Sequence, residues 1–398
     1  MRYLYTLIMN FIRFSNPLRI REGIVWIMVV VFLLTVSSRI VLTDTQSPST
    51  IDRVGAILPD SVWQTQLKKE MSIYRSTWPF PYKDILAGLP GANGMLGANK
   101  TKPQFDPGSQ RSTFLFHHLS LKGDSAGVDA FWPAIDALYA RQLPDGSFES
   151  HTNQHSLGAQ ANEIAFAQAR LSQGLLALEI SPLGANYQAR IDAVLPKLNQ
   201  SLDYIVHGTQ TNSRGVMVSN LDSLKGIDAR SPNRLALDAA FFIYSGLLLK
   251  NLDYVKIGND FIDLTFAKEA TDGAFLETTG GDVSYQVVTI WYLTELLNLE
   301  GITSAPKVDQ LRQAVSWTLA RINPTTGAID TSDSTRVNGQ EMTSNGISSH
   351  VKGPNLHEMG IGLYTFNVLL DDPDHPIVPH DLPLKVYTLH RAAPLRIR

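Results

Sequence analysis

A short glycine-containing loop recurs four times along the chain. The loops read GSFES from Gly146, GVMVS from Gly215, GAFLE from Gly273 and GAIDT from Gly327. They are 69, 58 and 54 residues apart, and each is followed by polar residues and then by an apolar segment. One helix of a hairpin cannot bury its apolar face alone, so a repeat of this length predicts helical hairpins that pack side by side.

Apolar residues at i, i+3, i+4 and i+7 spacing predict the helices themselves. These helices are expected over residues 61–75, 126–142, 159–179, 186–206, 233–251, 255–269, 284–299, 306–322 and 355–370. Segments 233–251 and 284–299 are apolar around most of their circumference, which predicts inner helices, whereas 186–206, 255–269 and 306–322 keep a polar face and are predicted outside.

No series of strands is visible in the sequence. The fold class we expect is therefore all-α, namely an incomplete or closed (α/α) toroid of helical hairpins with an N-terminal transmembrane helix. A simple up-and-down bundle is the alternative.

The transmembrane prediction rests on residues 23–42, an apolar stretch of bilayer-spanning length with Arg39 as its one charge. Four arginines precede it, so the positive-inside rule places residues 1–22 in the cytoplasm. We expect a single-pass anchor in the inner membrane and a main domain that is periplasmic or extracellular. A signal peptide cut near Ser37 and Ser38 is the alternative.

Differences in composition divide the chain after residue 42 into a tether, an arm and a helical domain. Residues 43–60 are polar, contain Pro and Ser, and are expected to form a tether. Residues 61–124 are expected to form a short helix and then an extended arm that is rich in Gly, Pro and Asn. The toroid domain is expected over residues 125–398, ending in a short C-terminal tail.

Charge and cysteine content exclude several functional classes. The 398 residues carry a formal net charge of −3 with no basic block, which argues against a nucleic-acid partner. The chain has no cysteine, so disulfides, thiolate metal sites and cysteine nucleophiles are excluded. Metal-ligand spacings and phosphate-binding loops are also missing from the sequence, and we expect no metal and no cofactor.

The hairpin repeat predicts where a functional site would lie. The polar residues that follow each glycine loop all fall where the inner helices begin, beside free backbone N–H groups and the positive ends of the helix dipoles. Asp145, Glu277 and Asp282 lie in or after these loops as carboxylate candidates. Asp282 is alternatively the N-cap of the next helix.

Three residues at the starts of inner helices are candidates for chemistry. Tyr285 lies in the first turn of its helix and can act as a general base or acid if a cation lowers its pKa. Asn233 and Arg234 follow a Ser-Pro helix start and can bind a carboxylate. The alternatives are a loop-capping tyrosine, a cap asparagine and a surface ion pair.

Three histidines lie in polar segments before inner helices. His151 and His155 follow the first glycine loop, and His350 lies in the long polar loop over residues 335–360. Long loops of this kind tend to be functional or mobile. These histidines are candidates for catalysis or sugar binding, with solvated loop residues as the alternative.

The pattern DGAF…SYQ over residues 272–286 resembles the α/α-toroid polysaccharide lyases of the chondroitin and alginate type, and DGSFESH at 145–151 resembles the form with a nearby histidine. The resemblance implies β-elimination from a uronate-containing glycan, with Tyr285 as base and then acid. It further implies that Asn233 and Arg234 hold the carboxylate while a histidine assists.

Two other functions stay open at the level of the sequence. One is a glycoside hydrolase with a carboxylate pair drawn from Asp145, Glu149, Asp272 and Asp282. The other is a non-catalytic glycan-binding or envelope polysaccharide assembly protein. All three functions predict a polysaccharide as the partner.

Overall fold

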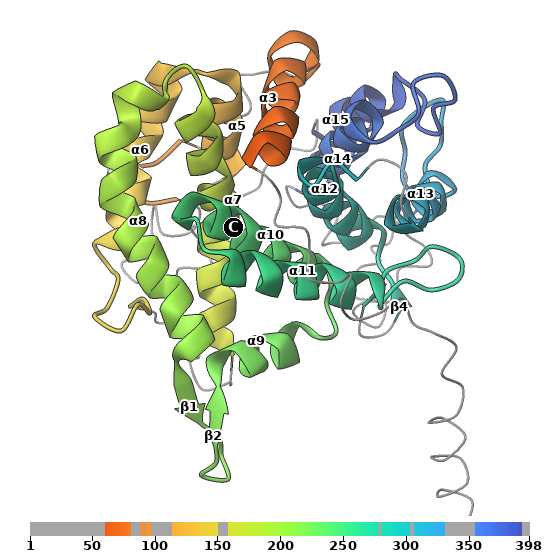
Figure 1. Cartoon of the computed structure of the whole chain (residues 1–398). Coiled ribbons are helices and arrows are strands. Elements are labelled where there is room, and N and C mark those ends of the chain that lie inside the picture. The colour runs from red at the N-terminus through yellow and green to blue at the C-terminus, as the bar shows by residue number, and fades with distance from the viewer. Residues whose placement is uncertain are drawn as a thin grey trace, which may run out of the picture. The chain divides into compact units, whose positions relative to one another are not determined.

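The computed structural model of the chain describes residues 60–80, 89–91, 93–96, 114–149, 158–277, 280–302, 306–330 and 355–391 (Figure 1). The chain divides into one unit over residues 1–56 and a second over 57–398, and all described residues belong to the second. The predicted membrane segment 23–42 therefore lies outside the described residues. None of the helices described has the length and hydropathy that a bilayer span requires.

The described part of the chain is all-α, as predicted. Its helices are α3 (Asp60–Thr77), α5 (Phe114–Lys122), α6 (Ser125–Tyr139), α7 (Ala159–Ile180), α8 (Gly184–His207), α9 (Asn220–Asp228), α10 (Pro232–Leu249), α11 (Leu252–Phe266), α12 (Val283–Leu299), α13 (Pro306–Leu319), α14 (Asn355–Leu369) and α15 (Leu382–Arg391).

Two short antiparallel ribbons connect helices. Strand β1 (Thr209–Thr211) pairs with β2 (Met217–Ser219), with Thr209 opposite Ser219. Strand β3 (Leu276–Glu277) pairs with β4 (Gly280–Gly281) directly before α12. Both ribbons follow an outer helix and lead toward an inner one, so they are part of the hairpin repeat.

Inner and outer helices alternate along the chain. All residues of α10 except Arg234 and Leu249 are buried, and all residues of α12 except Tyr285 and Val288. In contrast, α8, α11 and α13 bury one face only. The predicted assignment of inner and outer helices is therefore confirmed for these five.

The inner helices pack against one another, and each also packs against its outer partner. Helix α7 contacts α5 and α10, and α12 contacts α10 and α14. The outer helices α8, α11, α13 and α15 pack against α7, α10, α12 and α14 respectively. The side chains between these layers form one continuous hydrophobic core.

Side-chain caps fix where several helices begin. The Asp282 carboxylate accepts a hydrogen bond from the backbone N–H of Tyr285 at 2.8 Å and caps α12. Asp124, Ser219 and Asn251 cap α6, α9 and α11 in the same way. Such caps satisfy N–H groups that the helix itself leaves without acceptors.

The predicted glycine repeat is present in the backbone. Gly146, Gly215, Gly273 and Gly327 all have a positive φ, between +74° and +92°. At three of the loops a side chain within the turn accepts a hydrogen bond from a backbone N–H of the same turn. An isolated β-bridge closes each of these turns, and the bridges are Gln142 with Phe148, Glu269 with Phe275, and Ile322 with Ile329.

Three of these glycines are pressed against the next outer helix. A Cβ atom at Gly146 would lie 2.0 Å from the carbonyl oxygen of Gln200 in α8, and one at Gly273 would lie 2.5 Å from that of Gln313 in α13. Gly327 meets the backbone of α15 in the same way. Gly215 is different, because it lies at the tip of the β1–β2 ribbon with nothing within 4 Å.

The structure corrects the sequence prediction in three segments. The arm expected to be extended up to residue 124 contains the inner helix α5, the connection before α10 contains α9, and the expected C-terminal tail contains α15. Helix α5 (FLFHHLSLK) is short and has no polar face, since even His117 and His118 are buried. A short helix of this kind shows no amphipathic period.

Helix α3 stands between α5 and α12 (Figure 1). It packs against α5, α7 and α12, and its Tyr74 hydroxyl lies 3.2 Å from the hydroxyl of Thr365 in α14. The Arg75 Nε donates to the carbonyl of Leu121 at the end of α5. A groove of about 660 Å³ runs between α3 and the end of α7, lined by Lys68, Arg75 and Ile180 among others.

Candidate functional site

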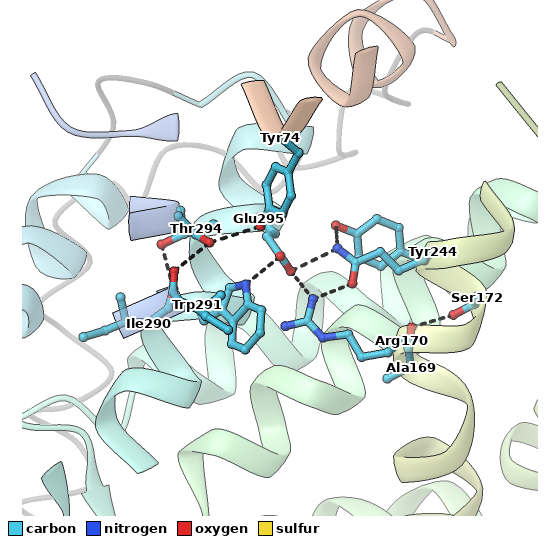
Figure 2. A network of polar contacts seen from close by, with 12 residues as sticks. Tyr74, Ala169, Arg170, Ser172, Tyr244, Ile290, Trp291, Thr294 and Glu295 are labelled. Carbon is cyan, nitrogen blue, oxygen red and sulfur yellow. Dashed lines mark hydrogen bonds and ion pairs between the residues drawn. The ribbon is translucent and has the colours of Figure 1, made fainter. Parts of the chain in front are cut away.

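A buried ion pair joins two inner helices (Figure 2). Arg170 of α7 pairs with Glu295 of α12, and their side chains are 4% and 0% exposed. The guanidinium lies against the rings of Trp291 and Tyr292, 4.4 and 4.0 Å from their centroids. The Trp291 indole also donates to Glu295 at 2.7 Å, so both charges have several partners.

Further polar side chains extend this pair to other helices. Gln173 accepts from Arg170 at 2.5 Å and donates to Glu295 at 3.0 Å, and its amide also lies 3.1 Å from the hydroxyl of Tyr244 in α10. We call the group of Glu70, Tyr74, Arg170, Gln173, Tyr244, Trp291 and Glu295 the central network. Every member is buried, so the central network holds helices together and does not face a ligand.

Glu70 is the least satisfied member of the central network. Both carboxyl oxygens are buried and have no hydrogen-bond partner among the described residues. Burial, reinforced by the nearby Glu295 and opposed by Arg170, raises the pKa of Glu70 well above its ordinary value. The carboxyl is therefore neutral over a range in which an exposed glutamate is charged.

We expect Glu70→Gln to change how stability depends on pH. A raised pKa in the folded state gives a stabilising contribution that is complete below the ordinary value of 4.5 and is lost as pH rises through the folded value. Above pH 4.5 the free energy of unfolding should fall less steeply in Glu70→Gln, by up to about 1.4 kcal/mol per pH unit. Urea titrations between about pH 5 and 8 measure this slope.

The control for Glu70→Gln is Glu149→Gln, which removes a carboxylate that is 50% exposed. The control should keep the wild-type slope. If Glu70→Gln also keeps that slope, Glu70 does not hold a proton in the folded state.

The central network also shows that the inner helices run in one direction. Arg170, Tyr244, Glu295 and Thr365 lie ten to twelve positions after the first residues of α7, α10, α12 and α14. Phe166 lies near Arg234 and Gln173 contacts Tyr244, so α7 and α10 run in the same direction. Helix α11 runs back along α10, with Gly258 against Ala239 and Gly246 against Val255, and the short β3–β4 turn then leads into α12, so α12 begins at the end where α10 begins. Helix α3 lies near the other end of α7, beside Ile180.

Where α7, α10 and α12 begin, several side chains remain accessible. Five of them, Glu163 and Phe166 of α7, Arg234 of α10, and Tyr285 and Val288 of α12, we call the rim. Nearly all of their neighbours along each helix are buried. The Arg234 guanidinium lies 5.7 Å from the centroid of the Phe166 ring, which joins the α7 and α10 parts of the rim.

Two aspartates lie behind Arg234. Asp228, the last residue of α9, accepts from the Asn162 amide at 2.6 Å and from the Arg234 guanidinium at 3.3 Å. Asp238 lies one turn after Arg234 in α10, and both of its carboxyl oxygens are buried with no hydrogen-bond partner among the described residues. Both carboxyls are 0% exposed, whereas Arg234 is 32% exposed and reaches the surface.

Burial raises the pKa of both aspartates, but by different extents. For Asp228 the effect of burial is opposed by Arg234 and by the hydrogen bond from Asn162. For Asp238 the charge of Asp228 adds to burial, and the pKa is raised well above its ordinary value. Asp238 is therefore the member of the pair that keeps a proton.

The predicted site residues divide into three groups. Tyr285 and Arg234 lie on the rim, and Asn233 is 6% exposed beside them with a carbonyl oxygen that has no partner among the described residues. Asp145 lies in a turn, Glu277 in strand β3 and Asp282 at a helix cap. His151, His155 and His350 lie outside the described residues.

The three carboxylates have structural positions. Asp282 is 1% exposed and is the N-cap of α12, which confirms the alternative given for it. Asp145 accepts from the backbone N–H and the hydroxyl of Ser147 within its own turn. Glu277 is 7% exposed in strand β3.

Sequence reasoning missed Asp228 and Asp238 as site residues. Asp238 had a usable signal, because it is the one acidic residue within the apolar segment LALDAAFFIY of an inner helix. A carboxyl in such a helix has to be paired or neutral. Asp228 had no comparable signal, since its role depends on contacts with α7 and α10.

The described residues contain no group of three or more histidines or carboxylates arranged to hold a metal ion. Comparison with protein-family models, curated proteins and solved structures found no match to this chain. The candidate site is therefore defined by the chain's own geometry.

Proposed function

We propose that the rim binds an acidic polysaccharide and that the chain cleaves it by β-elimination. The observation that carries the proposal is the placement of Arg234 and Tyr285. Each is the third residue of an inner helix, the two helices are packed neighbours that begin at the same end, and both side chains reach the surface.

The proposed chemistry divides between these side chains. Arg234 grips the uronate carboxylate, because a guanidinium can donate two parallel hydrogen bonds to it. Asn233 supports the same carboxylate from the preceding position. Tyr285, as the phenolate, takes the proton alpha to the carboxylate, and the resulting phenol gives this proton to the sugar oxygen as the bond from that oxygen to the beta carbon breaks. One of His151, His155 and His350 is proposed to assist.

The wider architecture supports a toroid as part of the same proposal. Five inner helices, α5, α7, α10, α12 and α14, alternate along the chain with the outer helices α6, α8, α11, α13 and α15. In an (α/α) toroid this order leaves a concave face where the inner helices begin, and α3 would close the opposite end. Residues 23–42 are proposed to anchor this domain on the outer side of the inner membrane.

The carboxylates considered for a glycoside hydrolase weigh against that alternative. Asp145, Asp272 and Asp282 accept hydrogen bonds that hold turns or a cap, and Glu149 pairs with Arg141. Asp228 and Asp238 are both 0% exposed, so neither carboxyl can face a glycosidic bond of a substrate at the rim.

We expect Tyr285→Phe to abolish most lyase activity, because the phenol is the proposed proton acceptor. The rate on a uronate-containing polysaccharide, followed by the ultraviolet absorbance of the unsaturated product, should fall by about 10²–10⁴-fold. The matched control is Tyr204→Phe on the outer helix α8, which should keep the wild-type rate. Reducing ends without that absorbance would identify a hydrolase, and binding without any product would identify a glycan-binding protein.

A further inference from the structure

The proposed carboxylate-binding arginine is held from behind by the buried carboxyl pair. Asp228, at the end of the preceding helix, accepts a hydrogen bond from Arg234 at 3.3 Å, and Asp238 lies one turn after Arg234 on α10. Neither carboxyl has contact with solvent. A ligand at the rim would therefore touch Arg234 but neither aspartate.

The surroundings of Asp238 require its carboxyl to keep a proton, because a buried carboxylate without donors is costly. Asp228 receives N–H donors from Asn162 and Arg234, one on each oxygen. The Asp238 oxygens are buried with no hydrogen-bond donor among the described residues, and after burial the charge of Asp228 is the largest influence on this carboxyl. Two neighbouring ionised carboxylates repel each other, whereas a carboxyl can donate a hydrogen bond to a carboxylate.

We propose that Asp228 and Asp238 share one proton and together act as the positioning group for Arg234. The pair then carries one negative charge, which matches the single charge of the guanidinium. Arg234 is fixed by one hydrogen bond to Asp228 and by the Phe166 ring, and a guanidinium has five N–H donors in all. The donors on its outer side are thus oriented toward the rim.

This arrangement predicts a pH dependence of anion binding. The charged groups that act on Asp238 are Asp228 and Arg234, and from α7 the neutral amide of Asn162 faces the pair. Loss of the shared proton at high pH adds a negative charge behind Arg234. Affinity for a uronate at the rim should then fall by roughly tenfold, as expected for one charge a few ångströms away in a partly exposed site.

The shared proton is tested directly by carbon-13 NMR of the full chain labelled at aspartate carboxyls. Wild-type protein should show one carboxyl that stays protonated at neutral pH, and this signal should be lost in Asp238→Asn. The exposed Asp222→Asn on α9 should retain it. Ordinary titration of every aspartate in the wild type would overturn the proposal, and that spectrum decides the point even if Asp238→Asn fails to fold.

The positioning role rests on the proposed function and is tested with an oligomer of galacturonic acid by calorimetry. Wild-type affinity should fall at high pH, and Asp238→Asn should keep its low-pH affinity throughout, because the amide donates to Asp228 without titrating. A wild-type affinity that does not change with pH would overturn the positioning role. No binding at any pH would refute the proposed function and the positioning role together, while the NMR result would still decide the shared proton.

Discussion

Replacing Arg170 by methionine is expected to destabilise the folded chain by about 3–5 kcal/mol, because it leaves Glu295 as a buried charge without its cation. The free energy of unfolding can be measured by urea titration with tryptophan fluorescence. The double variant Arg170→Met/Glu295→Met should recover most of the loss, since removing both charges also removes the cost of burying them.

The matched control for Arg170→Met is Arg190→Met on the outer surface. Arg190 pairs with Asp129 at 2.9 Å, but the two side chains are 49% and 58% exposed. Exposed ion pairs contribute little, so this change should cost less than about 1 kcal/mol. Equal losses for the two variants would show that the central network does not hold the inner helices together.

We also expect large losses of stability from Gly146→Ala and Gly273→Ala. A Cβ atom at these positions would strike the backbone of the next outer helix, and the φ angles of +91° and +92° are strained for alanine. Together these effects should cost about 2–5 kcal/mol each. Thermal or urea unfolding of the purified variants measures the loss.

Gly215, the remaining glycine of the repeat, separates the steric contribution from the contribution of backbone strain. Gly215→Ala meets nothing within 4 Å, so only the backbone strain of its φ of +74° remains, about 1–2 kcal/mol. Losses of the same size at Gly215 and Gly273 would mean that contact between each turn and the next outer helix does not contribute to stability.

Long helices with a clear apolar period could be predicted from the sequence to within a few residues. Helix α10 begins at Pro232 where residue 233 was expected, and α12 begins at Val283 where 284 was expected. These boundaries were predictable because caps and a proline mark them locally. Helix α5 was not, because its polar residues His117, His118 and Ser120 are buried together with its apolar ones, so they mark no exposed face.

The candidate site was predictable only in its accessible part. Arg234 and Tyr285 follow from their places in the first turns of inner helices, which local sequence indicates. The carboxyl pair behind Arg234 depends on how α9 turns back against α7 and α10. That arrangement results from long-range packing, with Asn162 bonded to a residue 66 positions later, and no local pattern encodes it.

The position of α3 sets an order for folding. Its Tyr74 bonds to Thr365, 291 positions later, and Thr77, which ends the helix, bonds to Tyr364. Helix α3 is made well before α14 leaves the ribosome, yet it cannot complete its contacts until α14 is present. The first described helix to be synthesised is thus among the last to reach its native environment, and until then its apolar face needs protection from other chains.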